Sequence, residues 1–211
     1  MNAPLVCVVD DDDAVRLSIG LLVETLGFPV RCFAGALDLL ADGEALEQAH
    51  CLVLDVRMPG LSGVGLQERL ARLGGSIPII FVSAHGDVPM VARAMREGAF
   101  DFLQKPFNEQ VLLDRVSEAV QLAGQRRTEA AWQQAFRSRL DGLTVREREV
   151  LDGMTAGRLN KQIAEDLGIS MKTVEQHRAR VMEKLQVESV AELVAHVIRA
   201  ARGQDGGWKG M

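Results

Sequence analysis

Four consecutive aspartates, Asp10 to Asp13, directly follow the apolar run 5–9 (LVCVV). A continuous apolar run of this length is typical of a buried strand in a parallel sheet. Neighbouring carboxylates repel one another, so a cluster of this kind is stabilised when a cation binds to it. Ligand sites of open α/β sheets lie outside the carboxyl ends of the strands. The sequence therefore predicts a site for a hard cation at that edge of the sheet.

Three other strand-like runs end close to a residue that can act on a phosphoryl group: Asp55, Ser83 and Lys105. Asp55 could attack phosphorus as a nucleophile, while the hydroxyl and the ammonium could donate to phosphoryl oxygens. With Mg²⁺ held by Asp10, Asp11 and Asp55, the predicted chemistry is transfer of a phosphoryl group to Asp55. Each residue taken alone also fits a turn or a surface position.

These side chains need a sheet to bring them together, and the first half of the chain alternates strand and helix patterns. We expect strands at Leu5–Val9, Val30–Phe33, Cys51–Leu54, Ile77–Val82 and Phe100–Leu103. We expect helices at Asp13–Leu26 (capped by Asp13), Ala36–Leu46, Val64–Leu73 and Val88–Glu97, with a fifth from Asn108–Glu109 onward. This alternation predicts an α/β fold with a five-stranded, doubly wound parallel sheet. The ends of its first and third strands meet at the switch point.

The last part of the chain reads as helix throughout. Thr144 and Glu147 have the spacing of a capping box. Two helices, Asn160–Leu167 and Met171–Leu185, are separated by a tight turn at Gly168, and a last helix spans Val190–Ala201. This order is typical of an all-α helix-turn-helix domain.

We therefore divide the chain into 1–121, a linker 122–140, a helical domain 141–203 and a disordered tail 204–211. The linker could be a helix, even a short coiled coil, or a flexible connector.

The second helix of this motif and the start of the first expose side chains that could contact DNA: Lys161, Lys172, Thr173, Gln176, Arg178 and Arg180. In a major groove, Gln176 is the better candidate for reading a base, and the others would hold phosphates. Glu175 could accept a hydrogen bond from a cytosine amino group or form a surface salt bridge. The same pattern also fits an ordinary solvated helix face.

Charge and cysteine content limit the possible domain organisation and cellular compartment. The 211 residues carry a net charge of −5. Residues 1–121 hold 17 acidic and 9 basic side chains (−8), and 122–211 hold 12 and 15 (+3), which suggests two domains with different partners. There is no signal peptide and no membrane-length apolar stretch. Cys7, Cys32 and Cys51 lack metal spacing, which favours reduced core residues of a cytoplasmic protein.

Residues 1–121 resemble the receiver domain of two-component response regulators. The motifs that carry the resemblance are V-V-D-D-D-D, L-D-V-R-M-P-G, F-V-S-A-H-G-D and F-L-Q-K-P-F. By this resemblance Asp55 is the phosphoacceptor, and Asp10 and Asp11 bind Mg²⁺ with it and with the backbone carbonyl of Arg57. Ser83 is both an active-site hydroxyl and a switch residue.

The same resemblance makes Lys105 an active-site residue and makes the Lys105–Pro106 peptide cis. It also gives Phe102 the aromatic switch position, where many relatives have tyrosine. Arg57 and His85 would tune the lifetime of the phosphoryl group by controlling access of water.

The segments L-T-V-R-E-R-E-V-L and G-R-L-N-K-Q-I-A-E-D-L-G-I-S-M-K-T-V-E-Q-H-R closely resemble the LuxR-type DNA-binding domain. The chain as a whole resembles the FixJ/NarL class of response regulators, and the FixJ branch most. The resemblance implies that a sensor histidine kinase phosphorylates Asp55. It also implies a homodimer that binds a double-stranded DNA operator and controls transcription, with RNA polymerase as a possible further partner and no membrane.

Two other functions are compatible with parts of this pattern. A phosphatase with a nucleophilic aspartate is one, but such enzymes usually carry an acid two residues after the nucleophile, where this chain has Arg57. The chain is therefore not expected to be an enzyme. The second such function is a receiver that works without phosphorylation. The presence of all three acidic residues, Asp10, Asp11 and Asp55, argues against it.

Overall fold

The protein divides into two compact units. The structure, a computed structural model, describes residues 3–74, 76–84 and 88–202. The first unit is Met1–Arg127 and the second is Thr128–Met211. Each is described by itself.

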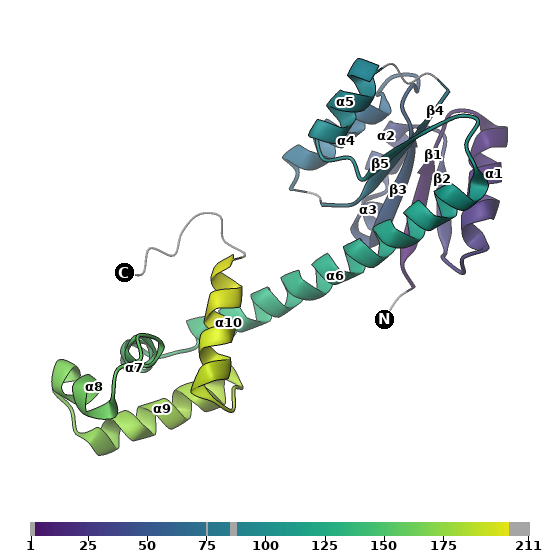
Figure 1. Cartoon of the computed structure of the whole chain (residues 1–211). Helices are drawn as coiled ribbons and strands as arrows, with labels where there is room; N and C mark the ends of the chain where they lie inside the picture. Colours follow the sequence, from purple (N-terminus) through teal and green to yellow (C-terminus); the bar gives the residue numbers. More distant parts are fainter. Residues whose placement is uncertain (1–2, 75, 85–87, 203–211) are drawn as a thin grey trace. The chain divides into compact units, whose positions relative to one another are not determined.

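The first unit is built on a single parallel sheet of five strands (Figure 1). The strands are β1 (Leu5–Val9), β2 (Val30–Phe33), β3 (Ala49–Asp55), β4 (Ile79–Ser83) and β5 (Asp101–Gln104), in the order β2-β1-β3-β4-β5. This confirms the predicted α/β fold. The register pairs Val9 with Leu54, and Ser83 with Gln104, so the carboxyl ends of four adjacent strands reach one edge.

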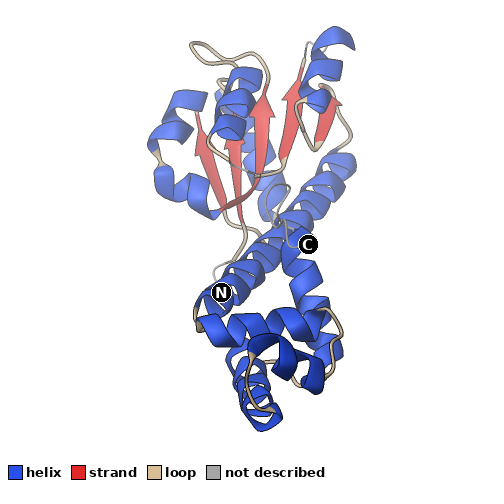
Figure 2. Ribbon diagram, turned by 90° about the vertical axis from the view of Figure 1, so that its left-hand side faces the viewer, coloured by secondary structure: helices blue, strands red, loops and turns tan. Residues whose placement is uncertain are grey.

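Helices cover both faces of this sheet (Figure 2). Strand residues alternate between the faces, because successive side chains point to opposite sides. Val6 and Val8 pack under α1 (Asp13–Glu24) and the first part of α6 (Glu109–Asp141). Leu5, Cys7 and Val9 face the other layer. That layer consists of α2 (Ala36–Ala41), α3 (Gly43–Gln48), α4 (Gly63–Arg72) and α5 (Val88–Arg96).

Three local expectations were wrong. The helix predicted at Ala36–Leu46 is two helices, because Asp42 leaves helical geometry and its side chain accepts from the Ala45 N–H at 2.9 Å, which starts α3. Asp12, not Asp13, caps α1. Cys32 is exposed, because β2 is an edge strand, whereas the other two cysteines are buried.

The helix α6 belongs to both units. Leu112 and Val116 pack on the sheet, and the Arg127 guanidinium donates to the carbonyls of Glu47 and Ala49 at 2.6 and 2.8 Å. Beyond the division at 127/128, Phe136 is fully buried in the core of the second unit. Residues 122–140 are therefore helical throughout, and the division between the units falls inside them.

The second unit consists of the end of α6 with α7 (Val145–Thr155), α8 (Asn160–Leu167), α9 (Met171–Leu185) and α10 (Val190–Arg202). The Trp132 ring stacks on Phe136, with centroids 5.3 Å apart, and the edge of His196 meets both rings. Arg199 lies 3.8 Å from the centroid of the Trp132 ring and pairs with Glu129. The tail 204–211 lies outside the described residues.

Two substitutions on the same helix should therefore destabilise different units. Phe136→Ala should cost the second unit about 3–5 kcal/mol, because it empties a fully buried aromatic position. Leu112→Ala should cost the first unit about 2–5 kcal/mol for the same reason. Amide hydrogen exchange of the full chain separates the two effects. Faster exchange in the sheet strands of the Phe136→Ala protein would contradict the assignment.

Candidate functional site: the acidic strand edge and the helix-turn-helix

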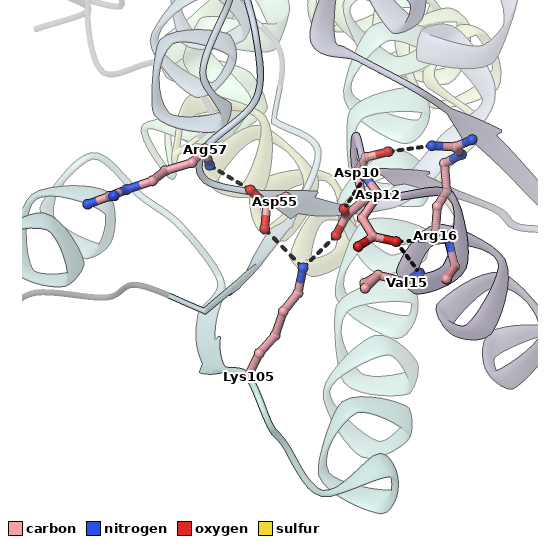
Figure 3. A network of polar contacts seen from close by, with 8 residues as sticks. Asp10, Asp12, Val15, Arg16, Asp55, Arg57 and Lys105 are labelled. Carbon is pink, nitrogen blue, oxygen red and sulfur yellow. Dashed lines mark hydrogen bonds and ion pairs between the residues drawn. The ribbon is translucent and has the colours of Figure 1, made fainter.

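The carboxylates of Asp10 and Asp55 share one ammonium group at the edge of the sheet (Figure 3). Both carboxylates are buried. The Nζ of Lys105, which follows β5, lies 2.7 Å from Asp10 Oδ2 and 3.0 Å from Asp55 Oδ1. The strand order therefore brings together three of the predicted site residues that are far apart in the sequence.

The turn between β1 and α1 fixes Asp10 through its neighbours. The N–H of Asp12 donates to Asp10 Oδ1 at 3.0 Å, and the Asp12 side chain accepts from the N–H groups of Ala14 and Val15. Arg16 Nη1 donates to the Asp10 carbonyl oxygen at 2.7 Å, and Arg16 also pairs with Asp13. Figure 3 shows the contacts among Asp10, Asp12, Val15 and Arg16 around one tight turn. Asp11, the other predicted metal ligand on this turn, is exposed.

The turn after β3 fixes Asp55. Its Oδ2 accepts from the Arg57 N–H at 2.6 Å, while the Arg57 side chain is exposed and extends away from the site (Figure 3). Gly63, at the start of α4, lies so close to the Asp55 carbonyl oxygen that a Cβ atom there would overlap it. Sequence reasoning did not identify Gly63, because a glycine at the start of a helix has many causes and the close approach is visible only in three dimensions.

Strands β4 and β5 supply the remaining predicted residues. Ser83 is buried at the end of β4, and its carbonyl accepts from the Lys105 N–H at 2.9 Å. The Lys105–Pro106 peptide is cis. Phe102 is half-buried on β5, with its ring centroid 6.4 Å from that of Phe81. His85 lies outside the described residues.

Burial and ion pairing act in opposite directions at this site. Burial raises the pKa of Asp55, although hydrogen bonds from Lys105 and from the Arg57 N–H partly offset that effect. For Lys105, burial acts to lower the pKa, but hydrogen bonds to Asp10 and Asp55 outweigh it, so the pKa is raised. A site with two carboxylates and a protonated lysine can hold both a metal cation and an anionic phosphoryl group.

The donor atoms at this edge are chemically suited to a hard divalent cation. Asp10 to Asp13 and Asp55 supply five carboxylates, and Lys105 and Arg16 supply two cations, which leaves an excess of three negative charges. Among the described residues, no three His, Cys, Asp or Glu side chains converge on one point as a complete metal shell. Oxygen ligands for such an ion would therefore also have to come from backbone carbonyls and water, as Mg²⁺ commonly allows.

In the second unit, α8 and α9 form the predicted helix-turn-helix. Gly168 ends α8 in the left-handed conformation (φ 65°), which glycine adopts without strain. Ser170 then caps α9, its Oγ accepting from the Thr173 N–H at 3.1 Å. Gly153 lets α7 approach α8, since a Cβ there would lie 2.7 Å from Ile163 Cγ1.

The predicted DNA-contacting residues lie at the starts of α8 and α9 and along α9. Lys161, Lys172, Gln176 and Arg180 are exposed, and Thr173 and Arg178 are half-buried. The first turns of α8 and α9 contain no acidic residue, so no carboxylate there competes with a DNA phosphate for the helix N-termini. Glu175 is also exposed.

Lys184, near the end of α9, holds α9 against α7. Its Nζ lies 2.7 Å from Oε2 of the buried Glu147 and 3.2 Å from the Gly142 carbonyl oxygen. Glu147 Oε2 also accepts from the Thr144 N–H at 2.8 Å, which completes the predicted capping box. These hydrogen bonds, that from Lys184 first, lower the pKa of Glu147 to about 2.

Comparison with known proteins places the chain in a family. Residues 6–117 match the response regulator receiver domain, and residues 141–197 match the bacterial regulatory proteins of the luxR family. The chain belongs to the response regulators of the FixJ/NarL class. It is accordingly a DNA-binding transcriptional response regulator, with the receiver on the first unit and the LuxR-type motif on the second.

Individual relatives match this response regulator over most of their length. The response regulator protein TmoT of Ectopseudomonas mendocina is 44% identical over 190 residues, covering 90% of this chain and 86% of TmoT. The transcriptional regulatory protein FixJ of Azorhizobium caulinodans is 40% identical over 193 residues, covering 92% and 91%. The low-resolution structure of the response regulator StyR is 46% identical, with a TM-score of 0.86, covering 94% of this chain and all of that one.

Within the described part of this regulator, no helix is both long enough and apolar enough to span a membrane.

The Glu147–Lys184 pair should make the stability of the second unit depend on pH. Because the folded-state pKa of Glu147 is lowered, its contribution is present above about pH 4.5 and is lost as the pH falls toward 2. Glu147→Gln should cost about 1–3 kcal/mol at pH 7, as expected when a hydrogen bond to a charged group loses its partner. Denaturant unfolding from pH 7 to pH 3 measures the difference from the unsubstituted protein.

The matched control is Glu149→Gln, because Glu149 lies on the same helix and pairs with Arg146 near the surface. Its effect should be small at every pH. A Glu147→Gln cost that stays the same at pH 3 as at pH 7 would contradict the account.

Proposed function

We propose that this response regulator is switched on by a sensor histidine kinase that transfers a phosphoryl group to Asp55. The observation that carries the proposal is the shared ammonium of Lys105 between the buried carboxylates of Asp10 and Asp55. A carboxylate that is held by a backbone N–H, beside a fixed cation, is preorganised to attack phosphorus. The products would be an acyl phosphate on Asp55 and a free histidine on the kinase.

The residues around Asp55 would have separate roles in this transfer. The Arg57 N–H donates to Asp55 Oδ2 at 2.6 Å and keeps the carboxylate oriented. Oδ1, which accepts from Lys105, would be the oxygen that attacks phosphorus. Lys105 and Ser83 would then donate to the phosphoryl oxygens from the ends of β5 and β4. Burial, which raises the pKa of Asp55, also keeps competing water away.

Asp10, Asp11, Asp55 and the Arg57 carbonyl would hold Mg²⁺, with water completing the shell. When bound, the metal would neutralise negative charge on the phosphoryl group during transfer. The excess negative charge of the acidic turn supports this choice of ion.

Phosphorylation would act on the rest of the receiver through Ser83 and Phe102. A hydrogen bond from Ser83 to the new phosphoryl group would draw the β4 end inward. Phe102, half-buried beside Phe81, would then rotate further toward the interior and alter the surface formed by α5, β5 and α6.

We propose that this altered surface forms a homodimer, so that two copies of α9 read half-sites about one DNA turn apart. Lys161, Lys172, Thr173, Arg178 and Arg180 would hold phosphates, and Gln176 would read a base. RNA polymerase is the partner through which the bound dimer would control transcription. A phosphatase function is not proposed, because the Arg57 side chain supplies no acid and extends away from Asp55.

Phosphorylation should raise affinity for the operator, which footprinting on random-sequence DNA can identify. With beryllofluoride and Mg²⁺ as a phosphate mimic, DNA affinity should rise about 5–150-fold, the usual range of coupling between two sites. The dimer fraction in analytical ultracentrifugation should rise with it. In the Asp55→Asn protein, the mimic should change neither the DNA affinity nor the dimer fraction. Equal DNA binding with and without the mimic would contradict the proposal.

DNA binding should also depend on salt through the basic residues of the helix-turn-helix. Lys172→Ala and Arg180→Ala should each reduce the slope of log affinity against log salt by about 1, whatever the DNA sequence. Gln176→Ala should instead cost about 1–3 kcal/mol and relax the sequence preference at one base pair. Arg146→Ala is the control, because this exposed arginine lies on α7 and pairs with Glu149. Salt-independent binding would rule out phosphate anchoring.

A further inference from the structure

We propose that Arg16 is a positioning residue of the phosphoacceptor site, which orients Asp10 and Asp11 for binding of a divalent cation. The inference rests on the proposed function and adds to it a residue on α1. The Arg16 side chain is only 17% exposed, although arginine is normally a surface residue. Its guanidinium donates to the Asp10 carbonyl oxygen at 2.7 Å and pairs with Asp13, as Figure 3 shows in part.

The first of these contacts controls the direction of two carboxylates. The carbonyl of Asp10 belongs to the peptide unit that joins Asp10 to Asp11, and a peptide unit is planar. Holding its oxygen therefore fixes the rotation of the whole unit. The side chains of Asp10 and Asp11 are attached at the two ends of this unit, so their directions are fixed with it. This unit follows directly on the last residue of β1, and the preceding unit is still held to the sheet, because the Asp10 N–H donates to the Phe33 carbonyl at 3.3 Å.

The contact does not use the carboxylate oxygens of Asp10. Asp10 Oδ1 accepts from the Asp12 N–H, and Oδ2 accepts from Lys105, while Arg16 occupies only the backbone oxygen. Arg16 therefore acts on the ligand through the backbone and does not occupy the oxygens that a cation would use. The guanidinium also offsets part of the repulsion within the four-aspartate turn.

A purely structural role in α1 does not account for this geometry. The start of α1 is already capped by Asp12, whose side chain accepts from the N–H groups of Ala14 and Val15. Arg16 instead reaches back across the turn to the end of β1. A planar guanidinium can serve the Asp10 carbonyl and the Asp13 carboxylate at once, which a lysine ammonium on a flexible chain does less well.

The test compares Arg16→Ala and Arg16→Lys in the full chain, with Arg31→Ala as the control. Arg31 lies in the same unit but pairs with Asp42 and Glu44, away from the site. Titration calorimetry with MgCl₂ measures metal affinity, and phosphorylation by acetyl phosphate is followed against Mg²⁺ concentration. Thermal unfolding establishes that each variant is folded.

Arg16→Ala should bind Mg²⁺ about 10–100-fold more weakly, the usual effect of losing a residue that orients a metal ligand. The maximal phosphorylation rate at saturating Mg²⁺ should stay close to that of the unsubstituted protein. Arg16→Lys should be intermediate, and Arg31→Ala should behave normally. If Arg16→Ala does not fold, the same measurements on Arg16→Lys, which keeps the charge and the apolar stem, test the proposal.

Two failures are distinguishable. If the unsubstituted chain neither binds Mg²⁺ nor accepts phosphoryl, the proposed function itself fails. If it does both, and folded Arg16 variants have unchanged Mg²⁺ affinity, only the role of Arg16 is overturned. A lower maximal rate with an unchanged Mg²⁺ dependence would overturn it as well, because it would show that Arg16 does not act through the metal ligands.

Discussion

Two buried carboxylates that share a single ammonium are the interaction on which the first unit depends. Bringing Asp10 and Asp55 together at the edge of the sheet is unfavourable without a cation. Lys105 supplies that cation from the end of β5, which is separated from β3 by β4. The pair of carboxylates nevertheless carries more negative charge than Lys105 can balance. The site therefore keeps an uncompensated negative charge, and the proposed function assigns that charge to the binding of a divalent cation.

The second unit is organised by an analogous but fully compensated pair. Glu147 is buried, but Lys184 and the Thr144 N–H both bind its carboxylate, and its pKa is lowered rather than raised. This pair fixes α9 on α7, and Lys172, Gln176 and Arg180 on the preceding turns of α9 are exposed. The carboxylate of Glu147 thus has its hydrogen-bond partners and serves to hold two helices together. Asp55 instead lies in an environment that disfavours its charged form, as expected of a reactive group.

The sequence predicted much of the fold, because alternation of apolar runs and helix signals is a local property. The predicted bounds of β1, β2, α8 and α9 coincide with those observed. The sequence could not predict the division of the helix 36–46 at Asp42, because aspartate there is compatible with a continuous helix unless its side chain caps the next one. The contact of Lys184 with Glu147 and that of Arg16 with the Asp10 carbonyl depend on how helices pack, so spacing alone did not reveal them.

The most direct test of the central claim is the intact mass of the chain after incubation with acetyl phosphate and Mg²⁺, followed by peptide mapping of the trapped acyl phosphate. The account predicts the mass of one added phosphoryl group, located on Asp55, and a strongly reduced yield in Lys105→Ala. An unchanged mass, or a phosphoryl group on any other residue, would contradict it.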